Sequence, residues 1–282
     1  MRDADALHCA TLVRERDFPR YASTLFVPPD KRRALLALHA FNLDVARIPD
    51  QVSQALPGEI RLQWWTDLLE GQGHGGVEGH PVAAELLAAI REHALPTRPL
   101  LRLIEARKFD LYNDPMPTLV ALETYLDDTV ATLFTTAARL LAPASEQVEH
   151  AARHSGIATG LVRAVARLRR DASRRQLYLP EDMLARHGAS DEQVCAGKTT
   201  PAISASCAEV LVEARTHRDA ALNLLADVPR EARPAFLQLA LLEYDLIRLA
   251  RPDRDPFAPY EPASRLRVLW TLWRASKAQV YS

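Results

Sequence analysis

The segment VRAVARLRRDASRRQLYLP, which spans residues 162–180, decides the expected fold and poses the main functional question. Read as a helix, it places arginines at spacings of four, seven and eleven residues, which together form one helix face. These arginines are Arg163, Arg167, Arg170 and Arg174. A single acid, Asp171, lies beside them. The pattern therefore predicts a helix that gathers positive charge on one side.

The rest of the chain shows that this positive charge is local. The 282 residues carry a formal net charge of −1, which argues against nucleic acid as a partner. Alanine, leucine, arginine and glutamate dominate, and this composition favours helix. Cys9, Cys195 and Cys207 lack CxxC spacing, so neither a disulfide framework nor a zinc site is expected. A reducing compartment, the cytoplasm, is the expected location. No apolar run approaches the ~20 residues that span a bilayer.

Helical periodicity recurs along the chain, whereas the alternating pattern of strands does not appear. Residues 30–48 place Leu35, Leu38, Phe41 and Val45 on one apolar stripe. The expected helices cover residues 30–48, 57–71, 81–94, 97–111, 117–141, 145–171, 181–187, 190–196, 201–226, 229–250 and 261–279. No segment resembles a linker between domains. The prediction is an all-α fold in which residues 1–282 form a single domain of long antiparallel helices.

The residue patterns leave three interpretations of the arginine face open. It is a solvated helix face, a set of ion pairs with acids on neighbouring helices, or an anion site, because guanidinium groups suit phosphate and diphosphate. Asp127 and Asp128 form an adjacent acidic pair in a long expected helix. Adjacent residues point about 100° apart, so a solvated face is the preferred interpretation of that pair. No HExxH or GxSxG motif is present.

Three segments of the chain carry a resemblance to a known family. DFPRYASTLFVPPDKRRALLALHAFN, residues 17–42, resembles an opening turn with tyrosine and serine that leads through an arginine pair into a helix. GHPVAAELLAAI, residues 79–90, resembles a helix that opens with His-Pro-Val. GIATGLVRAVARLRRDASRRQLYLP, residues 156–180, resembles a family segment with the same Tyr-Leu-Pro ending, which is the most specific match. Together these segments resemble the squalene/phytoene synthase family over nearly the whole chain.

The resemblance implies a fold and a reaction. Active members of this family are all-α enzymes that join two prenyl diphosphates head to head on an isoprenoid-synthase-like bundle. Two facing helices each carry an aspartate-rich motif, and the carboxylates hold Mg²⁺ ions that neutralise the departing diphosphate. By this resemblance Tyr21, in the opening turn, and Tyr178 are candidate ligand-binding residues.

The chain departs from the family pattern at both aspartate-rich motifs. Residues 46–50, aligned with the first motif, keep only Asp50, and residues 167–171, aligned with the second, keep only Asp171. Arg47 adds a further cation from the first stretch. Two lone acids beside several guanidinium groups are better placed to pair with them than to hold Mg²⁺. We therefore expect no catalytic residues, no metal and no cofactor; Mg²⁺ is expected only if an enzymatic alternative holds.

Within the family, the chain most resembles the branch of the mitochondrial complex I (NADH dehydrogenase) assembly factor and its bacterial relatives. Residues 156–164, 173–192 and 234–238 carry this similarity. It implies a non-catalytic protein that acts in the assembly of respiratory complex I or a related membrane complex, with complex I subunits or assembly intermediates as partners. Two alternatives stay open: a prenyltransferase of the squalene/phytoene synthase type, or a protein that binds a prenyl diphosphate or phospholipid. Either would use a cleft lined by Arg47, Arg163, Arg167, Arg170 and Arg174.

The C-terminal segment RLRVLWTLWRASKAQVY, residues 265–281, is the candidate for contact with a partner or, peripherally, with the inner membrane. It combines leucine and tryptophan with arginine and lysine, a mixture typical of an interfacial or partner-facing helix. The alternative is a last helix that closes the bundle, with Trp270 and Trp273 in the core. The sequence leaves both interpretations open.

Overall fold

The computed structural model describes residues 2–72 and 79–278, which form helices joined by loops, with no strand among them. The first elements are α1 (Arg2–Arg16), α2 (Phe18–Thr24), α3 (Pro29–Ala46), the 3₁₀ helix η1 (Ile48–Gln51), α4 (Ala55–Leu69), α5 (Pro81–His93), α6 (Arg98–Ala106), the 3₁₀ helix η3 (Arg107–Leu111), α7 (Leu119–Leu126), the π-helical η4 (Asp127–Ala131) and α8 (Thr132–Leu141). The remaining elements are α9 (Glu146–Ala166), α10 (Leu168–Ser173), α11 (Glu181–Arg186), α12 (Asp191–Cys195), α13 (Pro201–Leu224), the 3₁₀ helix η5 (Arg233–Phe236), α14 (Leu239–Leu249) and α15 (Arg265–Lys277). The predicted all-α class is confirmed.

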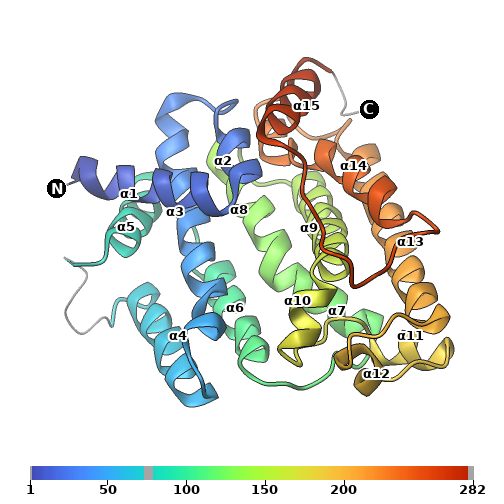
Figure 1. Ribbon diagram of the computed structural model, residues 1–282. Coiled ribbons are helices and arrows are strands. Elements are labelled where there is room, and N and C mark those ends of the chain that lie inside the picture. The colour runs from blue at the N-terminus through green and yellow to red at the C-terminus, as the bar shows by residue number, and fades with distance from the viewer. Residues whose placement is uncertain (1, 73–78, 279–282) are drawn as a thin grey trace.

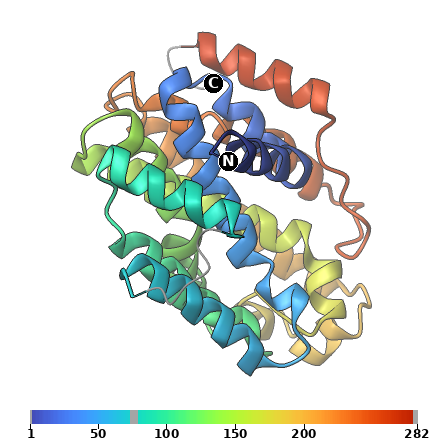
Figure 2. The same cartoon turned by 90° about the vertical axis from the view of Figure 1, so that its left-hand side faces the viewer.

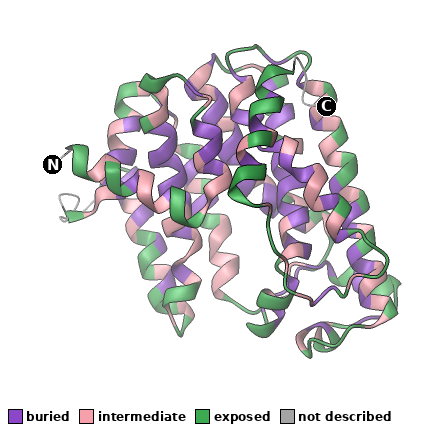
Figure 3. Cartoon of the chain, turned by 45° about the horizontal axis from the view of Figure 1, so that its top comes forward, coloured by how far each residue is buried: buried purple, intermediate pink, exposed green. Residues whose placement is uncertain are grey.

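Helices α3, α8 and α9 form the middle of the bundle. Helix α3 packs against α1, α5 and α8, and α9 packs against α8, α13 and α14. Figure 1 shows α1, α4 and α5 on one side of these helices and α11 to α14 on the other. Figure 2 views the molecule from the first of these sides, with α4 and α5 towards the reader. The buried residues gather in the middle of the bundle (Figure 3).

The sequence explains why α3 and α9 lie in the middle. The predicted apolar stripe of α3 is confirmed, because its members are at most 2% exposed: Leu35, Leu38, Phe41 and Val45. Helix α9 begins where the side chain of Ser145 accepts a hydrogen bond from the backbone N–H of Val148. Most of its buried residues are small, so neighbouring helices approach it closely.

Two glycines of α9 bring this helix directly against η4 and the end of α7. A Cβ atom at Gly156 would overlap the backbone of Ala131, and one at Gly160 would overlap the side chain of Leu126. A side chain at Gly156 would require the backbone of η4 to move, whereas one at Gly160 would require the end of the Leu126 side chain to shift. Segment η4 forms one π-helical turn between α7 and α8, and such turns frequently occur at functional sites.

The structure corrects several predicted helix boundaries. Helices α1 and α2 were not predicted, and the helix expected over residues 145–171 is broken at Arg167, whose φ of −101° and ψ of 3° separate α9 from α10. The helix expected over residues 229–250 begins only at Leu239, after the 3₁₀ turn η5. Residues 279–281, the end of the predicted C-terminal segment, lie outside the described residues.

Candidate functional site

A cavity of about 870 Å³ lies between η1, η3, α7, η4, α9 and α10. The charged residues that line it are Arg16, Arg20, Arg47, Arg107, Arg163, Arg167, Arg170 and Arg174, together with Asp17, Asp50, Asp110 and Asp171. Arginines thus outnumber acids by eight to four among the described lining residues. This imbalance gives the cavity a positive field, which attracts anions.

The predicted convergence of the arginine face on a cavity is confirmed. Every residue of the predicted group lines it: Arg47, Asp50, Arg163, Arg167, Arg170 and Asp171, and so do Arg174 and Tyr178. Tyr21 is not among the described lining residues. It lies on α2, where its ring centre is 6.2 Å from that of Phe18. The structure therefore brings together all the predicted ligand-binding residues except Tyr21.

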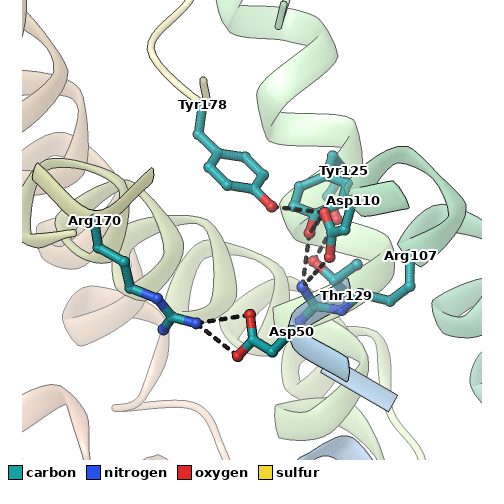
Figure 4. A network of polar contacts seen from close by, with 7 residues as sticks. All are labelled: Asp50, Arg107, Asp110, Tyr125, Thr129, Arg170 and Tyr178. Carbon is teal, nitrogen blue, oxygen red and sulfur yellow. Dashed lines mark hydrogen bonds and ion pairs between the residues drawn. The ribbon is translucent and has the colours of Figure 1, made fainter. Parts of the chain in front are cut away.

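Asp50 forms an ion-pair bridge from η1 to α10. Arg170 Nη2 donates to both carboxylate oxygens of Asp50, at 2.9 Å to Oδ1 and 2.7 Å to Oδ2, and Arg174 Nη1 also contacts Oδ1. Figure 4 shows the Arg170 side chain reaching Asp50 from the other side of the site. Partial burial opposes the ionised form, but the hydrogen bond from Arg174 and the charge of Arg170 lower the pKa of Asp50 below its usual value. The predicted pairing is confirmed for this acid.

The pairing prediction is wrong for Asp171. Its carboxylate has no ion pair within 4.0 Å among the described residues, although it lines the same cavity. Burial raises the pKa of Asp171 to about 6, and the charges of Arg167 and Arg170 oppose this rise without cancelling it. The physical reason is competition, because Arg170 and Arg174 both direct their guanidinium groups at Asp50 instead.

Asp17 and two arginines form the end of the cavity next to α2. The Asp17 side chain caps α2 by accepting from the backbone N–H of Arg20, and Arg20 Nη1 lies 2.9 Å from Asp17 Oδ2. Arg163 Nη2 lies 3.6 Å from the same oxygen. Burial alone would raise the pKa of Asp17, but these two guanidinium groups lower it. One carboxylate is thus shared between two cations.

The arginines of α9 and the α9–α10 junction are crowded and incompletely neutralised. Burial and the nearby charge of Arg20 lower the pKa of Arg163 to about 10. Burial and the charge of Arg163 likewise lower the pKa of Arg167. Arg167 and Arg47 have no ion pair with any residue in the described part of the chain. A bound anion would relieve this repulsion, since it would supply the missing negative charge.

A second polar network connects η3, α7 and the loop after α10. Arg107 Nη1 lies 2.9 Å from Asp110 Oδ2 and donates to the Tyr125 hydroxyl at 2.7 Å. The hydroxyls of Tyr125 and Tyr178 both donate to Asp110 Oδ1, each at 2.7 Å. Thr129, in η4, donates to the backbone carbonyl of Tyr125 at 2.6 Å. Figure 4 shows that the side chains of this network converge on Asp110.

The protonation states of this network follow from burial. Burial is the main cause that raises the pKa of Tyr125, and it also raises the pKa of Tyr178 well above the usual value. Both phenols therefore stay neutral at physiological pH and act as hydrogen-bond donors. Burial alone would lower the pKa of Arg107, but its contacts with Tyr125 and Asp110 raise that pKa above the usual value. The network therefore holds one carboxylate and one guanidinium in fixed positions at the cavity wall.

Sequence reasoning missed Arg107, Asp110 and Tyr125. Arg107 and Asp110 lie three residues apart in η3, a spacing that suits an ion pair but does not point to a site, and Tyr125 lies in α7, so no local signal connects it to them. Asp17 and Arg20 were missed as well, but a signal was present. An aspartate followed closely by proline is typical of a helix start, and the sequence Asp-Phe-Pro-Arg has this form.

The described acids do not gather elsewhere into a metal centre. No group of three or more histidine, cysteine, aspartate or glutamate residues in residues 2–72 and 79–278 is arranged to hold a metal ion. Asp127 and Asp128 point to different neighbours, with Asp127 Oδ2 3.6 Å from Arg153 Nε and Asp128 Oδ1 3.5 Å from Arg102 Nε. Both pairs are partly exposed, in agreement with the preferred interpretation of a solvated face.

Comparison with known proteins identifies the family. The squalene/phytoene synthase family matches residues 13–274, which is most of the chain. The protein therefore belongs to the squalene/phytoene synthase family, as its sequence segments predicted. Its fold is that of the family's solved members. The squalene synthase HpnC from Alicyclobacillus acidocaldarius superimposes with a TM-score of 0.76 at 20% identity, over 92% of this chain and 97% of that one.

The relatives include proteins named for complex I assembly. The chain is 34% identical over 253 residues to a Rattus norvegicus protein named "NADH dehydrogenase (ubiquinone) complex I, assembly factor 6", covering 90% of this chain and 76% of the relative. The human protein of the same name is 31% identical over 252 residues, covering 89% of this chain and 76% of that protein. The predicted resemblance to this branch is confirmed.

Proposed function

We propose that this protein is a non-catalytic member of its family that acts in the assembly of respiratory complex I or a related membrane complex. The observation that carries the proposal is the contact of Asp50 with both Arg170 and Arg174. The remaining acid of the first motif already has its oxygens occupied by guanidinium N–H groups. A metal ion at this position would have to displace two cations.

The remaining donors also fit Mg²⁺ poorly. This ion requires near-octahedral oxygen coordination, supported by carboxylates that neutralise its charge. Asp171, the remaining acid of the second motif, has the charges of Arg167 and Arg170 beside it. Its raised pKa reflects a carboxylate that burial makes less favourable to ionise. These features support a protein without catalytic residues, metal or cofactor.

The names of the relatives support the choice of partner. Relatives above 30% identity, the rat and human proteins among them, are named complex I assembly factor 6, so we propose complex I subunits or assembly intermediates as partners. We place the protein in the cytoplasm, in peripheral contact with the inner membrane. The test is deletion of the gene in its own cells, followed by native gel analysis of complex I. We expect loss of the assembled complex and rescue by the wild-type chain. Normal assembly in the deletion strain would contradict the proposal.

The absence of catalysis has a direct test. The purified chain is incubated with farnesyl or geranylgeranyl diphosphate, with and without Mg²⁺, and the products are extracted and analysed. We expect no presqualene diphosphate, squalene or phytoene above a control without protein, because one acid per motif cannot hold the metal cluster. Formation of any of these products would support the prenyltransferase alternative instead. An active synthase of the same family serves as the positive control.

A second candidate function is anion binding without turnover. The observation that favours it is the crowding of Arg163 and Arg167, whose pKa values are both lowered by burial and by neighbouring guanidinium groups. A prenyl diphosphate or a phospholipid would bring a phosphate group to these cations. Arg47, Arg170, Arg174 and Tyr178 are the further proposed ligand contacts. Tyr21 is retained as a proposed contact only on the resemblance, since it does not line the cavity.

Calorimetry without Mg²⁺ tests this second candidate. Farnesyl diphosphate and inorganic diphosphate are titrated into the wild-type chain, the Arg167→Gln variant and an Arg102→Gln control. Arg102 is 59% exposed and pairs with Asp128 away from the cavity. We expect Arg167→Gln to weaken binding by about tenfold or more and the control to bind normally. Equal binding by all three proteins would contradict the candidate function. So would a lack of binding in this titration that is restored when Mg²⁺ is added.

A further inference from the structure

Helix α15 has one face in the bundle and one face open. The inner face consists of Val268, Leu272 and Ala275, which are at most 7% exposed and lie on the side that packs against α2 and α14. The outer face carries large apolar side chains at i, i+4 and i+7, namely Leu266, Trp270 and Trp273, which are 80%, 56% and 54% exposed. The interpretation in which both tryptophans close the core is therefore wrong. Figure 3 shows α15 at the surface, with much of its length in the colour of exposed residues.

The charges on α15 have one sign. Its basic residues are Arg265, Arg267, Arg274 and Lys277, and the helix contains no acid. The Arg274 guanidinium carbon lies 4.7 Å from the ring centre of Trp270, and that of Arg267 lies 4.8 Å from the ring centre of Tyr244. None of the four has an ion pair with another described residue, so their charge is not neutralised within the described chain.

We propose that α15 lies flat on an anionic lipid surface, with Leu266, Trp270 and Trp273 inserted at the level of the headgroups. Exposed tryptophan beside leucine is typical of a helix at a membrane interface, and flanking arginines attract anionic headgroups. The helix has 13 residues and is about 20 Å long at 1.5 Å per residue, which is enough to lie in the interface. No helix in the described part of the chain is long and apolar enough to cross a membrane.

Charge complementarity favours lipid over another occupant. A second apolar pair is exposed on α4, where Leu56 and Ile60 are 64% and 62% exposed. Glu59 lies between them, and α4 has no exposed tryptophan. Arg61 follows Ile60, but Glu59 and Asp67 leave α4 with a net negative charge, which anionic headgroups repel, so we assign no lipid contact to α4. The pair on α4 therefore provides a control with matched apolar exposure. The inference on α15 is independent of the cavity and of any anion bound there.

Vesicle co-sedimentation of the full chain tests the proposal. One set of vesicles is pure phosphatidylcholine, and the other contains equal parts of phosphatidylcholine and phosphatidylglycerol. We expect binding to the anionic vesicles and little binding to the neutral ones. The Trp270→Ser/Trp273→Ser and Arg267→Gln/Arg274→Gln double variants should each bind anionic vesicles about tenfold or more weakly. The Leu56→Ser/Ile60→Ser control should bind like the wild type.

Two further measurements make the outcome decisive. Thermal melts by circular dichroism show whether the variants stay folded. We expect unchanged melting temperatures, because the substituted side chains are exposed. Unfolding is then excluded as the cause of weakened binding. Tryptophan emission should shift to shorter wavelength with anionic vesicles in the wild type and not in Trp270→Phe/Trp273→Phe. Wild-type binding by the two α15 variants would overturn the proposal. Failure of the wild type to bind anionic vesicles would also overturn the proposal. If purified complex I intermediates then protect Trp270 from solvent, α15 is a protein-binding helix.

Discussion

Asp50 and Arg170 are 120 positions apart in the chain, and yet Arg170 Nη2 lies 2.7 Å from Asp50 Oδ2. The contact joins η1, at the end of α3, to α10, and it lies at the wall of the arginine-lined cavity. Here an ion pair connects the two sides directly. Opposite charges thus hold η1 and α10 together.

Substitution Asp50→Asn should have a modest effect on stability. Arg170 and Asp50 are 51% and 29% exposed, so solvent screens much of their attraction. We expect the free energy of unfolding in urea to fall by about 1 kcal/mol or less, and the loss to shrink at high salt. A double-mutant cycle with Arg170→Gln isolates the pair. A salt-independent loss of several kcal/mol would show that the bridge is a buried interaction.

Asp171→Asn should stabilise the protein at neutral pH. The folded-state pKa of Asp171 is about 6, above the usual value of 3.8, so the folded state binds its proton more tightly than the unfolded state. Its contribution to stability is complete below pH 3.8 and is lost as pH rises through about 6. We therefore expect the variant to exceed the wild type by about 1–3 kcal/mol at pH 7 and by little near pH 4.

Asp50→Asn is the control for this pH profile, because its effect on stability depends on pH in the opposite direction. The pKa of Asp50 is lowered, so its favourable contribution is present above the usual value and is lost as pH falls through the folded pKa. Urea unfolding of both variants from about pH 2 to pH 8 measures the two slopes, because the change for Asp50 lies below its usual pKa of 3.8 and that for Asp171 lies above it. If the difference between Asp171→Asn and the wild type does not change with pH, the assigned environment of Asp171 is wrong.

Asp110→Asn should be strongly destabilising. The Asp110 side chain is 6% exposed, and it accepts hydrogen bonds from Tyr125 and Tyr178 while pairing with Arg107. Loss of its charge leaves a desolvated guanidinium, so we expect a loss of about 3–5 kcal/mol in the free energy of unfolding. Tyr178→Phe, which removes one donor, should cost about 1–2 kcal/mol.

The matched control for Tyr178→Phe is Tyr112→Phe. Tyr112 also donates its hydroxyl proton to a carboxylate, that of Glu59, but its side chain is 42% exposed. Water replaces the lost partner there, so the change in stability should stay within about 0.5 kcal/mol. Equal losses for the two tyrosine variants would contradict a buried network around Asp110.

Gly156→Ala tests the close packing of α9 against η4. The added Cβ would overlap the backbone of Ala131, and backbone cannot move away as a flexible side chain does. We expect a loss of about 1–3 kcal/mol or more in the free energy of unfolding. Gly79→Ala is the control, because a Cβ at Gly79 meets nothing within 4 Å. A neutral result for Gly156→Ala would show that α9 and η4 are not in close contact.

Much of the fold and part of the site could be predicted from the sequence. The apolar stripe of α3 and the arginine face of residues 163–174 depend on the period of 3.6 residues, which is a local property that the chain carries in its residue order. Convergence of this face on a cavity followed from the family resemblance, which supplied the missing long-range information. The break at Arg167 was not predictable in the same way, because helical periodicity continues through it.

The sequence by itself determined the helical class and the family, since each depends on residue type and order. Only the tertiary structure decided which charges meet. Tyr178 and Asp110 lie 68 positions apart and share one hydrogen bond, and no local pattern relates them. The same holds for α15, whose tryptophans are exposed because Val268 and Leu272 face the bundle. Which side chains meet across a helical bundle depends on how the helices pack, and the spacing of side chains along one helix does not specify this packing.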